Sequence, residues 1–86
     1  MKELERTLKA LANKRRLAIL KFLKSEKEAF VSAIAKEIQL SFKSTSRHLS
    51  VLINAEILEK DQRSTNVYYR LGSSLHPSAK HTISLL

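Results

Sequence analysis

Two amphipathic segments separated by only three residues constrain the fold of this chain more than any other feature. Residues 31–38 and 42–54 each repeat apolar side chains at the spacing of one helix face, so a turn must join them. The apolar stripe of the second segment consists of Thr45, Leu49, Leu52 and Ile53. The opposite, carboxylate-free face consists of Lys43, Arg47, Ser50 and Asn54. The pattern predicts a helix-turn-helix whose second helix lies against double-stranded DNA. The alternative is an ordinary surface helix, although such a face usually carries some Asp or Glu.

The start of this second helix suits a phosphate group. Ser41 is a good N-cap, and the helix N-terminus that follows it offers N–H groups and partial positive charge. His48 lies beside the outer face, where it can hydrogen-bond a phosphate or simply cover the protein surface. The candidate phosphate contacts of this segment are Ser41, Ser44 and His48.

A β-hairpin is predicted directly after the two helices. Residues 58–62 and 66–71 read as strands, and in the second of them apolar and polar side chains alternate. A hairpin in this position is typical of the wing of a winged helix. Its turn, residues 63–65, would carry Arg63, with Lys60 nearby, toward a phosphate. A solvated hairpin tip is the alternative.

Basic residues also open an earlier helix, expected at 14–25 after an Asn13 cap. Lys14, Arg15 and Arg16 stand in its first turn, where cations oppose the helix dipole. For the cluster we favour contact with phosphates, and for any single residue a solvated position is the alternative. Residues 25–29 are expected to form a charged connection to the next helix.

The first and last helices carry narrow apolar stripes that can pack on the core of the chain or on a partner chain. A short terminal helix is unstable alone and must dock. Small domains also gain buried area by pairing, so a homodimer is plausible. The candidate interface residues are Leu4, Leu8, Leu11, Leu75, Ala79, Ile83 and Leu86.

The charge balance indicates a polyanionic partner. Lys and Arg number 16 against 8 Asp and Glu, which gives a net charge of +8. Nucleic acid is the first candidate, because the basic residues are spread over several elements and not gathered on one membrane-binding helix. The absence of Cys excludes disulfides and thiolate metal sites. No acid pair, Gly-rich phosphate loop or nucleophilic triad indicates an enzyme.

Together these patterns predict one domain over residues 1–86, mainly α with a small β-hairpin (α+β). It would be a winged helix-turn-helix of five helices and a two-stranded wing. The expected helices are 2–11, 14–25, 31–38, 42–54 and 74–86, and the wing spans 58–71. Met1 is followed by charge, and no apolar run approaches the ~20 residues that span a bilayer, so we expect a cytoplasmic protein without membrane contact.

Three segments in the same order resemble the ArsR/SmtB-type repressors. Residues 10–20, ALANKRRLAIL, resemble the opening ALADPxRLxIL of that family, and residues 40–52, LSFKSTSRHLSVL, resemble its LSQSTVSRHLxxL. Residues 67–71, VYYRL, are similar to the end of its wing. The resemblance covers residues 4–72 and implies a homodimer, paired through its first and last helices, on a roughly palindromic operator. It also implies that the first residues of the recognition helix meet bases, here Phe42, Lys43, Ser46 and Arg47.

Two of these residues raise separate questions. Phe42 stands where the family usually has Gln, and packing at the helix start is as plausible as contact with a thymine methyl. Arg47 is the best candidate for guanine O6 and N7.

Many members of that family release DNA on binding metal, but the usual ligands are missing here. Phe30 and Ser32 occupy the positions of a common Cys-x-Cys pair. His76 and His81 lie about 140° apart on a helix and have no Asp or Glu after Asp61 to complete a site. We therefore expect no metal and no cofactor, and leave open a small-molecule or protein effector. The predicted function is a sequence-specific repressor, with a non-specific DNA-coating protein or a protein-interaction module as the alternative.

Overall fold

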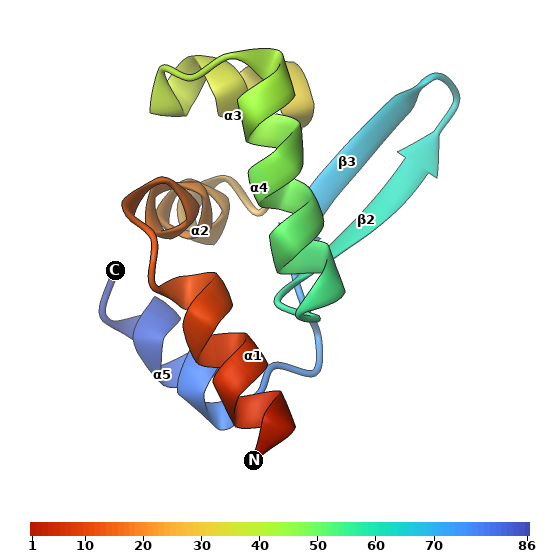
Figure 1. Cartoon of the computed structure of the whole chain (residues 1–86). Helices are drawn as coiled ribbons and strands as arrows, with labels where there is room; N and C mark the ends of the chain where they lie inside the picture. Colours follow the sequence, from red (N-terminus) through yellow and green to blue (C-terminus); the bar gives the residue numbers. More distant parts are fainter.

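Five helices and three short strands follow one another along residues 1–86, all of which the computed structural model describes. The elements are α1 (Lys2–Leu11), α2 (Lys14–Glu26), β1 (Glu28–Phe30), α3 (Val31–Ile38), α4 (Phe42–Asn54), β2 (Leu58–Arg63), β3 (Asn66–Leu71) and α5 (Pro77–Ser84). In Figure 1, α3 lies across one end of α4, the β2–β3 hairpin (the wing) projects beside it, and α1 and α5 lie together at the opposite end. The predicted class, mainly helical with a small wing, is confirmed.

The helix boundaries have local causes. The Asn13 side chain accepts hydrogen bonds from the N–H groups of Arg15 (2.9 Å) and Arg16 (3.0 Å), and so begins α2. Ser41 begins α4 in the same way, since its hydroxyl accepts from the Ser44 N–H at 3.1 Å. Gln39 ends α3 with φ 55°, in the left-handed region that usually favours Gly or Asn. The turn between α3 and α4 therefore forms without glycine.

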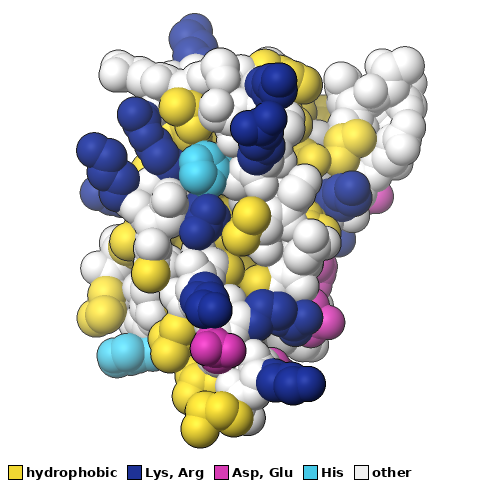
Figure 2. Space-filling view, in the orientation of Figure 1, with side chains coloured by type: hydrophobic (Ala, Val, Ile, Leu, Met, Phe, Trp, Pro, Cys, Tyr) yellow, Lys and Arg dark blue, Asp and Glu magenta, His cyan; other side chains and the backbone are white.

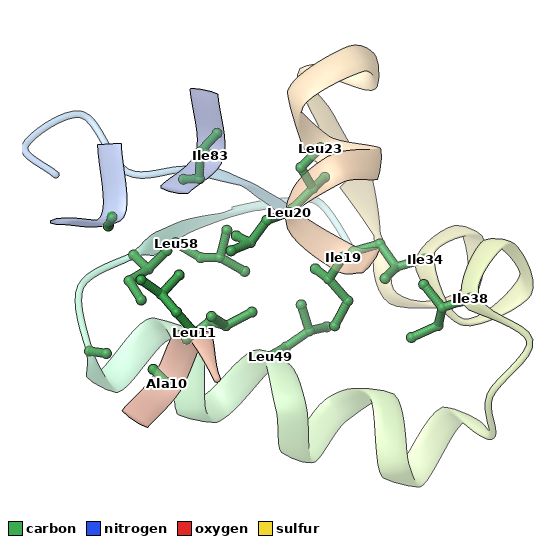
Figure 3. Packing of buried hydrophobic residues seen from close by; sticks show 14 of the residues in the cluster. Ala10, Leu11, Ile19, Leu20, Leu23, Ile34, Ile38, Leu49, Leu58 and Ile83 are labelled. Atoms are coloured by element: carbon green, nitrogen blue, oxygen red, sulfur yellow. The ribbon is translucent and has the colours of Figure 1, made fainter. Parts of the chain in front are cut away.

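The core joins the apolar stripes of α2, α3 and α4. Ile19 and Leu20 from α2 and Leu49 from α4 belong to one cluster, which Figure 3 shows together with residues from both chain ends. Ile19, Leu20 and Leu52 have no exposed surface. Fully burying a side chain of this size contributes about 1.5–3 kcal/mol, so the core fixes the orientation of α4 firmly.

The wing has two strands, as predicted, but residues 25–29 are not the plain charged connection that the sequence suggested. Glu28–Phe30 forms β1, and the strand order is β1-β3-β2, antiparallel throughout. Glu28 pairs with Arg70 and Phe30 pairs with Tyr68, while Ala29 is buried. Such a short strand has no alternation to reveal it, and its partner is far along the chain.

The end of the chain also differs from expectation. β2 continues through Arg63, so the wing turn consists of Ser64 and Thr65. α5 begins at Pro77, later than the predicted residue 74, because His76 is its N-cap and accepts from the Ser78 N–H at 3.1 Å. Ser73, which lies between β3 and α5, donates its N–H and hydroxyl to Glu59, at 2.7 and 2.6 Å.

No helix combines the length and the apolar character that crossing a bilayer requires.

Candidate DNA-binding surface

The outer face of α4 carries polar and apolar side chains that have no partner within the chain. Phe42, Lys43 and Arg47 are exposed and Ser46 is half-buried, and none of their side chains makes a hydrogen bond or ion pair. The opposite face is held in the core by Leu49 and Leu52. The structure thus brings all four predicted base-contact residues to one surface.

Phe42, for which the sequence allows packing at the helix start or contact with a thymine methyl, has a largely exposed side chain. Its side chain is 64 % exposed and does not belong to the core cluster. A large apolar ring at the first position of a helix gains nothing from water, so it is available to a partner. Thr45, one turn further along α4, faces the core and is fully buried, and its hydroxyl has no hydrogen-bond partner.

Charge is distributed unevenly around this surface. Figure 2 shows Lys and Arg side chains over α4 and the helices beside it, while Asp and Glu side chains lie at the lower end and the right-hand edge. Ser41 and Ser44 stand at the helix N-terminus, and no acid occurs in its first turn. The positive end of the helix dipole therefore adds to the charge of the side chains.

The cations at the start of α2 have mainly structural partners. Arg15 Nη1 donates to the Ile38 carbonyl at the end of α3, at 2.9 Å. Arg16 Nε donates to the Ala10 carbonyl at 2.6 Å, and Arg16 Nη2 donates to the Lys9 carbonyl at 3.2 Å. Two arginines at the unfavourable end of their own helix thus meet the favourable C-terminal ends of α3 and α1. Lys14 alone is exposed with no partner.

Arg16 also determines the state of His48 on α4. Arg16 Nη1 lies 3.2 Å from His48 Nδ1, and because a guanidinium can only donate, Nδ1 must accept. His48 is then neutral and its ring proton is on Nε2. Burial of the ring lowers the pKa of His48, and the charges of Arg16 and Arg15 lower it further. The uncharged His48 ring has one N–H, on Nε2, that can donate to a phosphate.

Arg63, which the sequence predicts to reach a phosphate from the wing turn, ends β2 and has partners within the chain. Arg63 donates to both carboxylate oxygens of Glu28, at 2.7 and 2.8 Å, and to Asp61 at 3.0 Å. Its guanidinium lies 4.7 Å from the Tyr68 ring centroid. The hydrogen bonds to Glu28 and Asp61 raise the pKa of Arg63, and the bond from Arg63 lowers that of Glu28. Lys60, by contrast, is exposed and unpaired.

Three of the predicted interface residues are unavailable to a partner. Leu11, Ala79 and Ile83 are buried because α1 and α5 pack against one another within the chain. Leu75 and Leu86 are half-buried against the same core. Leu4 and Leu8 remain 37 % and 48 % exposed, and Leu85, which the sequence analysis did not include, is 72 % exposed.

The two histidines near the end of the chain differ in their contacts. His76 caps α5, with its Nδ1 2.7 Å from the Ser78 hydroxyl, and His81 is exposed. Phe30 packs edge-on against Tyr68, with ring centroids 5.6 Å apart. No three His, Asp or Glu side chains are grouped as metal ligands would be.

Comparisons with known proteins agree with this geometry. The sequence profile described as "Bacterial regulatory protein, arsR family" matches residues 13–60. The homodimeric winged helix-turn-helix DNA-binding domain Mb0332 from Mycobacterium bovis is 31% identical with a TM-score of 0.83, and the match covers 98% of this chain and 74% of that one.

Two further solved structures are similar over nearly the whole chain. HlyU from Vibrio cholerae is 32% identical (TM-score 0.82), and the match covers 98% of this chain and 84% of that one. NolR from Sinorhizobium fredii is 30% identical (TM-score 0.83), with 98% and 80% covered. A comparison with curated protein sequences gave no match.

Proposed function

Because the chain belongs to the ArsR family of bacterial regulatory proteins, we propose that it is a sequence-specific repressor that binds a palindromic operator as a homodimer. The observation that carries the proposal is the outer face of α4, where Lys43, Ser46 and Arg47 are held outward without an internal partner. Side chains that are free in the absence of DNA lose no protein contact when they meet base edges.

Each residue has a role that its chemistry suits. Arg47 donates in bidentate fashion to guanine O6 and N7, and Phe42 packs on a thymine methyl. Lys14, Lys60 and the Nε2–H of His48 contact phosphates, as do the N-terminal N–H groups beside Ser41 and Ser44. Two such faces, related by two-fold symmetry, fit successive major grooves about 34 Å apart. Occupation of a promoter by this dimer blocks transcription without any chemical step.

The dimer forms through the exposed leucines of the terminal helices. Leu4 and Leu8 on α1 and Leu85 after α5 offer an apolar surface that the chain does not cover itself. Replacing Leu8 by Glu places a charge in this surface, and we expect a monomer by sedimentation at concentrations where the unaltered chain is dimeric. DNA affinity falls in parallel, since one half-site alone remains bound.

The test of the proposal is selection of genomic DNA fragments by the purified protein, followed by competition between the selected fragment and bulk DNA. A shared inverted repeat and a specificity ratio of at least ~10³ are expected. A ratio near one contradicts the proposal and favours non-specific DNA coating, for which the net charge of +8 is the supporting observation. Transcription from a promoter carrying the repeat falls when the protein is added.

A further inference from the structure

A hollow of about 310 Å³ lies between α1 and the last turns of α4, outside the surface assigned above. Its floor is apolar and its rim holds three cations and an amide. The lining residues are Arg6, Lys9, Ala10, Arg16, Val51, Asn54 and Ala55. No carboxylate lines it. A concave site with several converging hydrogen-bond donors and no negatively charged group suits an oxyanion.

The donors of the hollow are available. Arg6 makes no hydrogen bond or ion pair, and the only ion pair of Lys9 is a 3.8 Å contact with Glu5 between two largely exposed side chains. Such an exposed pair is weak and readily exchanged. Arg16 uses one N–H each on Nε, Nη1 and Nη2, so two of its five N–H groups remain.

The position of the hollow connects it with the α4 face. Asn54 follows Lys43, Arg47 and Ser50 at helical spacing, so the outer face of α4 runs directly into the hollow. On α1, Lys2, Arg6 and Lys9 form a stripe at i, i+4 and i+7, on the side away from Leu4 and Leu8. Figure 2 shows Lys and Arg side chains continuing down this face from α4 onto α1.

We propose that this hollow is a second oxyanion site, in which Arg6, Lys9 and the free N–H groups of Arg16 bind a phosphate-type group. The oxyanion can come from two sources. The first is a DNA phosphate between the two half-sites of an operator, where α1 approaches the dimer axis, and this source rests on the proposed function. The other source is a free small anion, held against the apolar floor. The DNA phosphate and the free anion would bind to the same donors.

Substitution of the rim cations tests the site, with a matched charge change elsewhere as control. The variants are Arg6→Gln and Lys9→Gln, and the control is Lys21→Gln, an exposed and unpaired lysine on α2. The readout is the slope of log affinity against log salt on duplex DNA. A DNA phosphate in the hollow predicts a slope smaller by about 0.9 for each rim variant and unchanged for the control.

A free anion is tested with inorganic phosphate as the probe, in the absence of DNA. Saturable NMR shifts of the Asn54 side-chain amide, abolished in Arg6→Gln and retained in Lys21→Gln, support the site even if the salt slopes do not change. Unchanged slopes together with no saturable shift overturn the proposal. These results are separable from the proposed function, because the slopes are also measurable on bulk DNA, whereas the proposed function fails only if the unaltered protein shows no sequence preference.

Discussion

Arg47 on α4 and Arg63 on the wing are exposed arginines on neighbouring elements, but their surroundings are opposite. Arg47 has no partner within the chain, whereas Arg63 is bound by Glu28 and Asp61 and lies over Tyr68. α4 is fixed by buried side chains and leaves its polar groups for DNA. The base of the wing is held in the core by Leu58, but the outer part of the wing is held by the polar contacts of Arg63. Exposure and positive charge alone therefore do not identify a DNA contact.

The largest expected effect tests how each element is anchored. Leu49→Ala removes a side chain that is only 1 % exposed, and should lower the free energy of unfolding by about 2–5 kcal/mol. Val67→Ala on the half-buried wing should cost only about 1 kcal/mol. Urea unfolding followed by circular dichroism, at one fixed protein concentration, measures both. Equal losses would mean that Val67, in the outer part of the wing, is packed as firmly as Leu49.

The next effect compares the two arginines directly. Arg47→Ala should weaken operator binding by about 1–3 kcal/mol and scrambled DNA much less, because it removes a base contact. Arg63→Ala should change the affinity for both duplexes little, since its guanidinium is already satisfied. Fluorescence anisotropy with the two duplexes measures this difference. If Arg63→Ala costs as much as Arg47→Ala, the contrast between the two elements is wrong.

A smaller effect should appear when Arg63 is released. Glu28→Gln removes the carboxylate that accepts two of its hydrogen bonds, and Arg63, then paired only with Asp61, should reach a phosphate. DNA affinity should rise, and the salt slope should become steeper by up to about 0.9. The same substitution in an Arg63→Ala background is the control. A gain that persists there would come from net charge alone.

The smallest effect concerns His48. Its pKa is lowered in the folded chain, first by burial and then by Arg16 and Arg15, so the fold favours the neutral ring. The contribution of His48 to the free energy of unfolding is therefore fully present above the ordinary histidine pKa of about 6.5, and it is lost as the pH falls below that value. Glu28 and Glu59, whose pKa values are also lowered, stay ionised at pH 5.5.

Thermal unfolding at pH 7.5 and 5.5 measures the His48 contribution. His48→Gln, which keeps an acceptor for Arg16 but does not titrate, should lose less stability over this range than the unaltered chain. An identical loss in both would show that the neutral state of His48 does not matter to the fold.

Local periodicity explains what the sequence could predict. The buried stripe of Leu49 and Leu52 and the free face of Lys43 and Arg47 follow from helical spacing within a few residues. The partners of Arg63 and Arg16 could not be found in this way, because Glu28 and His48 are distant in sequence and meet them only in the folded chain. The basic first turn of α2 was the one sign in the sequence that its arginines have partners elsewhere, since cations there oppose their own helix dipole.

The arrangement β1-β3-β2 has a consequence for how the chain is made. The central strand is the last to leave the ribosome, so both outer strands remain without hydrogen-bond partners until translation has passed Leu71. The helices around Ile19 and Leu49 can assemble earlier. The nascent protein would thus form α4 before its wing. Until β3 pairs with both outer strands, Glu28 and Arg63 would lack their ion pair.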